Sequence, residues 1–499
     1  MQLVSLPSKR SPEILVDKRA MFVLVIGASL ALGIYLLASI LKYRLGFPLD
    51  DSWIHQTYAR NLATHGEWAF LSGKPSSGST SPLWSALLAF GFWLGLSPYY
   101  WTFLLGCLIL WALAVLCENT ARQLLPGYPG WFPWVGLFIV GEWHLTWSAG
   151  SGMETLLHTL IVTAVLAAIM TGKPRYLALG LLIGISVWIR PDGLTLLGPV
   201  ALVALLTEKT NSSRLGALTR LLFGFGSLFV PYLLFNLILS GSPMPNTFYA
   251  KQAEYAFWQV KPVSVRLTRL ILQWSAGLSV VIFPGVIGWL VISFRRRDWG
   301  TLAGVFWCFG YILLYALRLP IYQHGRYVIP AMPIYFLWGL MALLEFGKSN
   351  LFSRFHRAIN LSWQSIVFFV WLGFWVLGAR AYAEDVAYIE SEMVVSARWV
   401  ADNLPPDALV AAHDIGALGY FGHHDLIDMA GLVSPEVILF IKDEVRLAAY
   451  LDARGADYLI AFPDVYPRLI IRATPVYCTQ STSILAMGEE DMVVYRWNR

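Results

Sequence analysis

Two adjacent carboxylates, Asp50 and Asp51, follow the first long apolar run of the chain. If a helix begins at this pair, Asp51, His55 and Tyr58 lie on one face at the i, i+4 and i+7 positions. An aspartate in the first turn of a helix commonly caps it and interacts favourably with the helix dipole. Capping by one carboxylate leaves the other able to face a cavity and take part in catalysis.

A second polar segment runs from Gly73 to Trp84 and is rich in glycine and hydroxyl groups. Such a segment would let the backbone approach a phosphate or a sugar, although it lacks the Gly-Lys-Thr of a Walker loop. A turn followed by an interfacial helix that opens at Ser81 and Pro82 explains the same residues equally well.

Charged residues form further clusters between apolar stretches. Arg190-Pro-Asp192-Gly is either a turn in which Arg190 and Asp192 pair or part of a functional site. Arg326 could serve such a site or extend its charged end to the membrane surface. His324 alone is a weak signal, and His423-His424 lack the spacing of metal ligands, so we assign no metal site.

The composition is that of a membrane protein. Of 499 residues, 57% are hydrophobic and 13% charged, against roughly 25% charged residues in a soluble domain. The formal net charge of +5 comes from short basic clusters between apolar runs, which is typical of topology determinants. A continuous basic face is absent, so we expect no binding of nucleic acid. The four cysteines indicate neither a disulfide framework nor a metal site.

A helix needs roughly 20 apolar residues to cross a bilayer. With residues 1–20 in the cytoplasm, residues 21–41 form the first span, and the basic clusters then fall inside, as the positive-inside rule requires. Residues 81–96 and 99–117 together provide one net crossing, so we expect 11 crossings or 12 membrane-embedded helices. The further expected spans are 131–149, 153–171, 176–189, 194–206, 221–239, 270–294, 300–317, 327–346 and 361–379.

This topology places the polar clusters on the outer side of the membrane. They fall in the outer loops 42–80 and 240–269 or at the outer tips of hairpins. Ionisable residues at such depth are costly and are usually functional or partnered. We therefore expect one outer site that collects them. If a helix starts at Asp51, its residues Trp53, Ile54 and Leu62 can lie on lipid.

From residue 381 to 499 the composition changes to that of a soluble domain. Residues 388–404 have helical periodicity, and several short apolar runs indicate strands. The fold class expected is a polytopic α-helical membrane domain, residues 21–380, with a small extracytoplasmic α/β domain at the C-terminus. The strand candidates are 408–412, 426–428, 458–461 and 492–495.

The ordered motifs resemble those of the GT-C superfamily of glycosyltransferases. The resemblance is greatest to the mycobacterial terminal arabinofuranosyltransferase type and its bacterial relatives. It runs from residue 50 to about residue 435, and the matching set is specific for the broad family rather than for the sugar. The motifs are Asp50-Asp51-Ser-Trp-Ile-His55-Gln-Thr-Tyr58, Gly78-Ser-Thr80-Ser-Pro, Ser151-Gly-Met-Glu154, Arg190-Pro-Asp192-Gly, Pro245-Asn246-Thr-Phe-Tyr249-Ala-Lys251, Arg326-Tyr327 and Asp414-Ile-Gly-Ala-Leu-Gly-Tyr420.

The resemblance implies an enzyme of the plasma membrane, bacterial in type, that acts at the outer face. Its donor would be a polyprenyl-phosphate sugar, and its acceptor an extracytoplasmic glycan, lipid or protein. Inverting transfer would use Asp51 or Asp50 as the base, with preference for Asp51. The acidic residues could serve a divalent cation, which some GT-C enzymes require and others do not, but we do not predict one. The expected substrate-binding residues are His55, Tyr58, Glu154, Arg190, Asp192, Asn246, Tyr249, Lys251, His324, Arg326 and Asp414.

Two other classes of function fit part of the pattern. A transporter or flippase of lipid-linked sugars would place polar groups near the middle of the membrane and often carries internal repeats. Here charge collects at one interface and a sizeable outer domain follows. The second class is an oligosaccharide ligase, an enzyme that uses a diphosphate-linked donor. The sequence does not distinguish such a ligase from a transferase.

Overall fold

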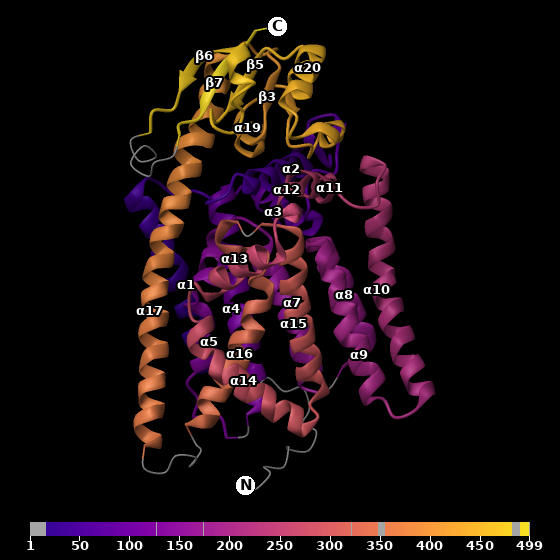
Figure 1. Ribbon diagram of the computed structural model, residues 1–499, viewed down its shortest axis with the longest axis vertical. Helices are drawn as coiled ribbons and strands as arrows, with labels where there is room; N and C mark the ends of the chain where they lie inside the picture. The colour runs from indigo at the N-terminus through magenta and orange to yellow at the C-terminus, as the bar shows by residue number, and fades with distance from the viewer. Residues whose placement is uncertain are drawn as a thin grey trace.

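Apolar helices form most of the molecule, and a small β-sheet lies at one end of them (Figure 1). The computed structural model describes residues 16–125, 127–172, 174–320, 322–347, 355–481 and 490–498, so most of the predicted cytoplasmic segment 1–20 lies outside the described residues. Within the described ranges, seven helical segments are long and apolar enough to cross a membrane. They are α1 (Lys18–Lys42), α4 (Pro98–Leu124), α10 (Asn211–Ser240), α14 (Ser279–Arg296), α15 (Trp299–Arg318), the segment Gln323–Phe346 that ends in α16 (Met332–Phe346), and the segment that contains α17 (His356–Tyr388).

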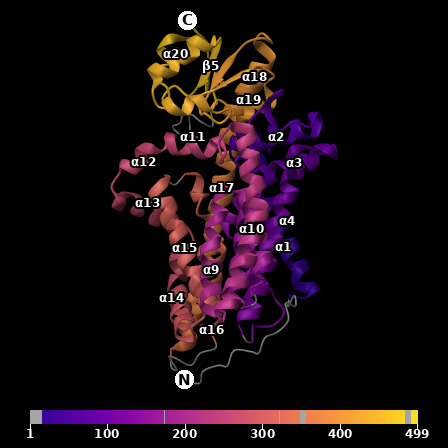
Figure 2. The same ribbon diagram turned by 90° about the vertical axis from the view of Figure 1, so that its right-hand side faces the viewer.

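Four shorter apolar helices accompany these seven segments. The seven long apolar segments make the chain an integral, multi-pass membrane protein. Helix α3 is only 12 residues long, too short to cross, and lies beside α2 at the end near the sheet (Figure 2). The four are α3 (Pro82–Trp93), α7 (Thr155–Met170), α8 (Tyr176–Ile189) and the segment Pro191–Thr207, which consists of η1 (Pro191–Leu196) and α9 (Leu197–Thr207).

The prediction of one continuous span over 131–149 is wrong. The segment forms α5 (Trp134–Val140) and α6 (Trp143–Gly150), which are separated by Gly141 and Glu142. A Cβ atom at Gly141 would lie 2.1 Å from the ring of Trp371, so only glycine fits here. Glu142 then accepts a hydrogen bond from the N–H of Leu145 and opens a new helix.

The span predicted over 270–294 is also interrupted. Helix α13 (Val263–Ser275) ends at Ala276, and α14 begins only at Ser279. Gly277, with φ of 140°, allows the chain to change direction between them. Helix α13 carries Arg266 and Arg269 among apolar residues, which suits an amphipathic helix at the membrane surface.

Close packing inside the bundle depends on small residues. Helices α8 and α10 approach so closely that a Cβ at Gly180 would lie 2.2 Å from the carbonyl oxygen of Leu221. A Cβ at Gly224 would lie 2.4 Å from the carbonyl oxygen of Leu177. Reciprocal glycines of this kind let two backbones touch where lipid offers no hydrophobic driving force.

The segment that follows α1 lies under the sheet rather than on lipid. It forms α2 (Asp51–His65), β1 (Ala69–Leu71) and β2 (Lys74–Pro75). The prediction that Trp53 and Ile54 face lipid is wrong, because both are buried. The ring of Trp53 packs against Tyr420 and Phe421 of the C-terminal domain, with centroids 4.7 and 4.6 Å apart.

The C-terminal domain contains a five-stranded sheet in the order β4-β3-β5-β7-β6, of which the first three strands are parallel. All four predicted strands are confirmed, as β3 (Val410–Ala412), β4 (Leu426–Asp428), β5 (Tyr458–Ala461) and β7 (Val493–Trp497). The edge strand β6 (Ala473–Cys478) escaped prediction because it contains Pro475, a residue tolerated mainly on sheet edges. The helices are α18 (Val395–Asn403), α19 (Gly416–Phe421) and α20 (Glu444–Arg454).

Helix α17 joins the membrane bundle to this domain (Figure 1). It continues through one π-helical segment, Ile389–Val394, into α18. Glu390 of that segment forms an ion pair with Arg44 at 2.6 Å, whereas Glu392 accepts a hydrogen bond from the N–H of Met492 at 2.8 Å. One buried carboxylate is thus tied to the bundle and the other to the sheet.

Candidate active site

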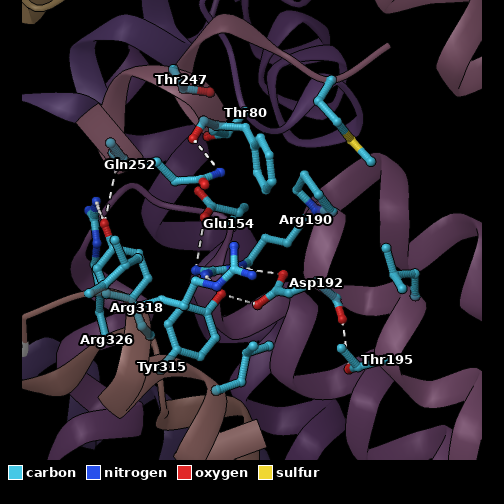
Figure 3. Close-up of a pocket in the computed structure, with 18 of the residues that line it drawn as sticks. Thr80, Glu154, Arg190, Asp192, Thr195, Thr247, Gln252, Tyr315, Arg318 and Arg326 are labelled. Atoms are coloured by element: carbon cyan, nitrogen blue, oxygen red, sulfur yellow. Dashed lines mark hydrogen bonds and ion pairs between the residues drawn. The ribbon is translucent and has the colours of Figure 1, made fainter. Parts of the chain in front are cut away.

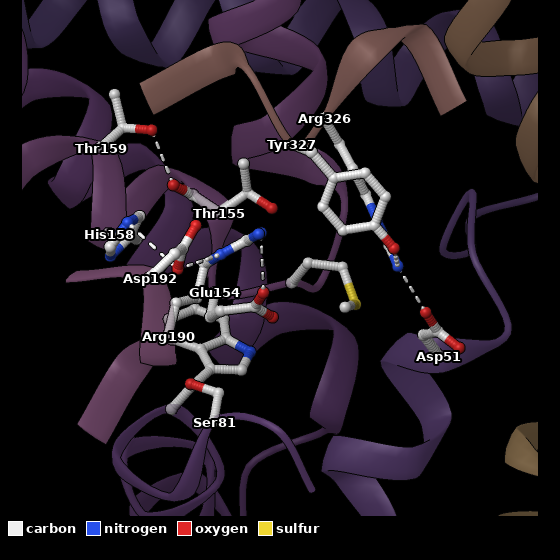
Figure 4. Close-up of polar contacts among 12 residues, drawn as sticks. Asp51, Ser81, Glu154, Thr155, His158, Thr159, Arg190, Asp192, Arg326 and Tyr327 are labelled. Atoms are coloured by element: carbon white, nitrogen blue, oxygen red, sulfur yellow. Dashed lines mark hydrogen bonds and ion pairs between the residues drawn. The ribbon is translucent and has the colours of Figure 1, made fainter. Parts of the chain in front are cut away.

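Asp51, the first residue of α2, forms ion pairs with two cations from distant parts of the chain. Its Oδ2 atom lies 2.7 Å from Arg326 Nη2 and 3.6 Å from Lys251 Nζ (the Arg326 contact is drawn in Figure 4). Both cations also donate to the hydroxyl of Tyr327, at 3.2 Å from Lys251 and 3.3 Å from Arg326. Three segments, α2, α11 (Asn246–Glu254) and the turn before α16, therefore meet at one carboxylate.

Burial and the two neighbouring positive charges have opposite effects on the pKa of Asp51. Burial acts to raise the pKa of Asp51, but the charges of Lys251 and Arg326 outweigh it and hold that pKa well below its usual range. Arg326 is only 3% exposed, and its Nη1 atom has no hydrogen-bond partner among the described residues. A buried guanidinium N–H without a partner is costly, so this atom is a candidate donor to a ligand.

Asp50 has a different role from its neighbour. It precedes α2 but makes no side-chain capping bond to that helix. Its two carboxylate oxygens accept the backbone N–H groups of Gly416 and Ala417 at the start of α19, at 2.7 and 2.8 Å. A Cβ atom at Gly416 would lie 2.1 Å from the carbonyl oxygen of Asp50, so the C-terminal domain sits directly on this residue.

A second network surrounds Arg190, at the end of α8. Its guanidinium lies 3.5 Å from Glu154 Oε1 and 3.2 Å from Asp192 Oδ1, so the predicted pair of Arg190 with Asp192 is confirmed (Figure 4). Tyr311 and Tyr315 of α15 donate their hydroxyls to Asp192 Oδ2 at 2.6 and 2.5 Å. The guanidinium of Arg190 is thereby held by Glu154 and by Asp192.

Two buried histidines extend this network away from the arginine. His55 Nε2 lies 3.4 Å from Glu154 Oε2, and its Nδ1 lies 3.0 Å from Ser85 Oγ. His158 Nε2 lies 3.7 Å from Asp192 Oδ1. The polar groups of α2, α7, α8 and η1 thus form one continuous buried chain, as a charge in an apolar bundle requires.

Two cavities meet at the Asp51 cluster. The larger, of about 330 Å³, has mainly apolar walls with Glu154, Arg190 and Asp192 on one side (Figure 3). The smaller, of about 130 Å³, is polar and lies between Asp51 and the C-terminal domain. Lys251, Arg326 and Tyr327 line both. The apolar walls of the larger cavity include Met153, Leu194, Met244, Phe248, Leu314 and Leu319, and the smaller adds Asp50, Glu254, Tyr255, Tyr322, His413 and Asp414.

Comparison with solved structures identifies the architecture. ArnT from Cupriavidus metallidurans, bound to undecaprenyl phosphate, matches with a TM-score of 0.59 at 16% identity, over 95% of this chain and 98% of ArnT. The Archaeoglobus fulgidus oligosaccharyltransferase matches with a TM-score of 0.61 at 10% identity, over 91% of this chain and 70% of that one. The arabinofuranosyltransferase AftD from Mycobacteria matches with a TM-score of 0.50 at 13% identity, over 95% of this chain and 40% of AftD.

All three are GT-C superfamily members. The chain has a GT-C-like fold. Residues 382–495, within the C-terminal part, match a family described as "Domain of unknown function (DUF8728)". No curated protein matches the chain in sequence.

Within this GT-C-like fold, most of the predicted site residues line the two cavities. Five do not. Tyr58 accepts the N–H of Gly78 at 2.9 Å, and Asn246 donates to the carbonyl of Leu432 at 3.1 Å, so both hold loops together. His55, Tyr249 and His324 also lie off the cavity walls. The residues that line them are Asp50, Asp51, Glu154, Arg190, Asp192, Lys251, Arg326 and Asp414.

Sequence reasoning missed several residues of the candidate site. Tyr311 and Tyr315 are one turn apart on an apolar helix, a spacing that could have indicated a polar partner such as Asp192. Glu254 and His413, whose nearest atoms lie 3.5 Å apart, come from α11 and from the loop after β3. Nothing in the local sequence indicates that this helix end and this loop meet.

The described residues contain no group of three or more His, Cys, Asp or Glu side chains placed to hold a metal ion. The carboxylates Asp51, Glu154 and Asp192 instead face cations of the protein itself. The arrangement can hold an anion at the cations, and it can accept a proton at a carboxylate beside them.

Burial raises the pKa of Asp50 from 3.8 to about 7, helped by the charge of Asp414 and opposed by the two N–H groups that it accepts. The folded protein therefore binds this proton more tightly than the unfolded chain does. We predict that the contribution of Asp50 to the stability of the wild type falls by up to roughly 4 kcal/mol as the pH rises from about 4 to about 7. Asp50→Asn cannot titrate and should lose this part of the pH dependence in thermal unfolding. Asp425→Asn, at an exposed ion pair with Lys74, is the control; equal pH profiles for Asp50→Asn and the wild type would contradict the assignment.

Proposed function

We propose that the protein transfers a sugar from a polyprenyl-phosphate donor to an acceptor hydroxyl on an extracytoplasmic glycan, lipid or protein. The observation that carries the proposal is the position of Asp51 with Lys251 and Arg326 at the junction of a large apolar-walled cavity and a small polar one. The GT-C-like fold supports it, because ArnT, which has a similar fold, is known in a structure with undecaprenyl phosphate.

The larger cavity suits the donor. Its apolar walls can hold the first units of a polyprenyl chain, and Lys251, Arg190 and Arg326 supply positive charge for the phosphate. Arginine is suited to phosphate because its planar fork can donate two parallel hydrogen bonds. The Nη1 atom of Arg326, which has no hydrogen-bond partner within the described ranges, is one such donor. Glu154 and Asp192 keep Arg190 in place and could also bind sugar hydroxyls.

The smaller cavity suits the acceptor. An acceptor hydroxyl oxygen there attacks the anomeric carbon and forms the new glycosidic bond. The bond between that carbon and the phosphate oxygen breaks, and its electron pair leaves with the polyprenyl phosphate. The hydroxyl proton passes to Asp51, and attack from the side opposite the phosphate inverts the anomeric centre.

Asp51 is a better candidate for this base than Asp50. Both oxygens of Asp50 are occupied by backbone N–H groups of α19. Asp51 faces the acceptor cavity, and its Oδ2 is held by cations that line the donor cavity as well. A donor phosphate would share those cations, reduce their effect on Asp51 and make it more basic.

The location of the site follows from the charge pattern of the chain. The positive-inside rule places the basic clusters in the cytoplasm, which puts the outer loops 42–80 and 240–269 and the C-terminal domain on the outer face. In this orientation residues 1–20 are cytoplasmic and residues 381–499 form an extracytoplasmic domain. Nucleotide sugars are not available there, whereas a lipid-linked donor reaches the cavity laterally within the membrane.

The direct test is transfer by the purified protein in liposomes from radiolabelled polyprenyl-phosphate sugars to cell-envelope acceptors. Formation of a labelled acceptor with release of polyprenyl phosphate supports the transferase. Movement of the intact labelled donor across the bilayer without any transfer would instead indicate a flippase. Dependence on a diphosphate-linked oligosaccharide would indicate a ligase.

We predict that Asp51→Asn lowers kcat by about 10²- to 10⁴-fold, the usual contribution of a general base. Binding of undecaprenyl phosphate should persist or tighten, because the substitution removes a negative charge that competes for Lys251 and Arg326. Initial rates and lipid binding measured on the same preparation check both parts. The matched control is again Asp425→Asn, and near-normal turnover in both Asp51→Asn and Asp50→Asn would remove the proposed base.

We predict that Arg326→Ala weakens binding of the donor by about 10- to 100-fold, as expected for loss of charge-assisted hydrogen bonds. Arg326→Lys should recover only part of this loss, because an ammonium group cannot make a bidentate contact. The KM for the acceptor should change much less than the KM for the donor. Arg380→Ala, at an exposed position on α17, serves as the control. Unchanged donor affinity in Arg326→Ala would refute its role at the phosphate.

A further inference from the structure

The turn that precedes Arg326 has an unusual backbone. Gln323, His324 and Gly325 have successive positive φ angles of 50°, 57° and 72°. Only four non-glycine residues among the described ones have positive φ, and two of them are adjacent here. Side chains other than glycine rarely adopt this conformation, and it persists only where the surrounding structure holds it.

A carboxylate on α17 holds this turn. Asp385 Oδ2 lies 2.7 Å from His324 Nε2 and accepts the indole N–H of Trp147 at 2.8 Å. The His324 ring also contacts Trp143 and Trp147 of α6 edge to face, with centroid distances of 5.4 and 5.3 Å. His324 is thus fixed by two rings and one anion, and it is not among the residues that line the two cavities.

The turn determines where the next side chains go. Within it, the N–H of Gly325 donates to the carbonyl of Tyr322 and the N–H of Arg326 to that of Gln323, at 2.9 and 3.2 Å. Tyr322 and Gln323 line the polar cavity, and Arg326 and the residue after it line both. A small rotation of this backbone would move the guanidinium of Arg326 away from Asp51 and from the donor cavity.

We infer that Asp385 is a positioning residue, which acts through His324 to hold the guanidinium of Arg326 between Asp51 and the donor cavity. This inference rests on the proposed function, because it assigns the turn a role in binding the donor phosphate. Asp385 touches neither cavity. Its contribution is to keep a costly backbone conformation populated, so that the phosphate meets an arginine already in place.

A double-mutant cycle on the full-length protein tests this coupling, with undecaprenyl phosphate in detergent micelles as the probe. Asp385→Asn keeps the shape of the side chain but removes its charge, and we expect it to weaken lipid binding by about fivefold or more, within the range of coupling found between contacting residues. In the Arg326→Ala background the same substitution should have almost no further effect. A purely structural role would lower thermal stability and add equally to the loss in both backgrounds.

His324→Gly is a second variant that does not depend on the folding of Asp385→Asn. Glycine adopts positive φ without cost, so the turn can form while its tie to α17 is lost. We expect weaker lipid binding with little change in melting temperature, together with faster amide exchange over residues 322–331. Glu384→Gln is the matched control, since Glu384 is the neighbour of Asp385 on α17 and pairs only with the exposed Arg380 in the described ion pairs.

The outcomes separate the two proposals. If Arg326→Ala leaves lipid binding unchanged, the proposed donor site fails and this inference fails with it. If Arg326→Ala weakens binding but Asp385→Asn and His324→Gly do not, only the positioning role is overturned. Losses for Asp385→Asn that are equal in the wild-type and Arg326→Ala backgrounds would also overturn it.

Discussion

Buried charge at the edge of a membrane has to be neutralised locally, and this constraint shapes the whole site. Asp51 lies between Arg326 and Lys251, and Arg190 lies between Glu154 and Asp192. Removing a single partner would leave an uncompensated ion in a medium that solvates it poorly. The two clusters can therefore form only when α2, α7, α8, α11 and the turn before α16 are all in position.

The same requirement extends to the C-terminal domain. Asp50 precedes Asp51 directly, and its carboxylate accepts the first N–H groups of α19. Trp53, one turn on, packs against Tyr420 and Phe421 of the same domain. The carboxylate at the junction of the cavities is consequently held in place by the packing of the sheet domain on α2, which explains why this helix is buried.

Much of this arrangement could be predicted from the sequence, because charged residues in an apolar chain are rare enough to identify. Asp51, Glu154, Arg190, Lys251 and Arg326 were all expected at one site, and the structure brings them to the cavity walls. What sequence could not supply was contact between loops. Helical periodicity alone decided which residues of α2 share a face. The neighbours of α2 belong to a domain more than 300 residues further along the chain.

The broken spans have the same explanation. Hydropathy reports how apolar a segment is, but not whether another side chain interrupts it. At Gly141 the ring of Trp371 occupies the space that any larger side chain would need, and Glu142 starts the next helix. After this interruption, α6 carries Trp143 and Trp147, whose rings contact His324.

Under the proposed function, the pairing of Asp51 with Arg326 and Lys251 also explains how so much positive charge stays organised. Asp51 accepts a hydrogen bond from Nη2 of Arg326, while Nη1 of the same guanidinium has no partner in the part of the chain that the structure describes. A phosphate that arrives from the apolar cavity can bind at the Nη1 atom first and then share the cations. Each step of that exchange leaves Asp51 less neutralised, so the arrival of the donor itself makes the carboxylate a stronger base for the acceptor hydroxyl. Binding of the leaving group and activation of the nucleophile are in this way coupled through two side chains.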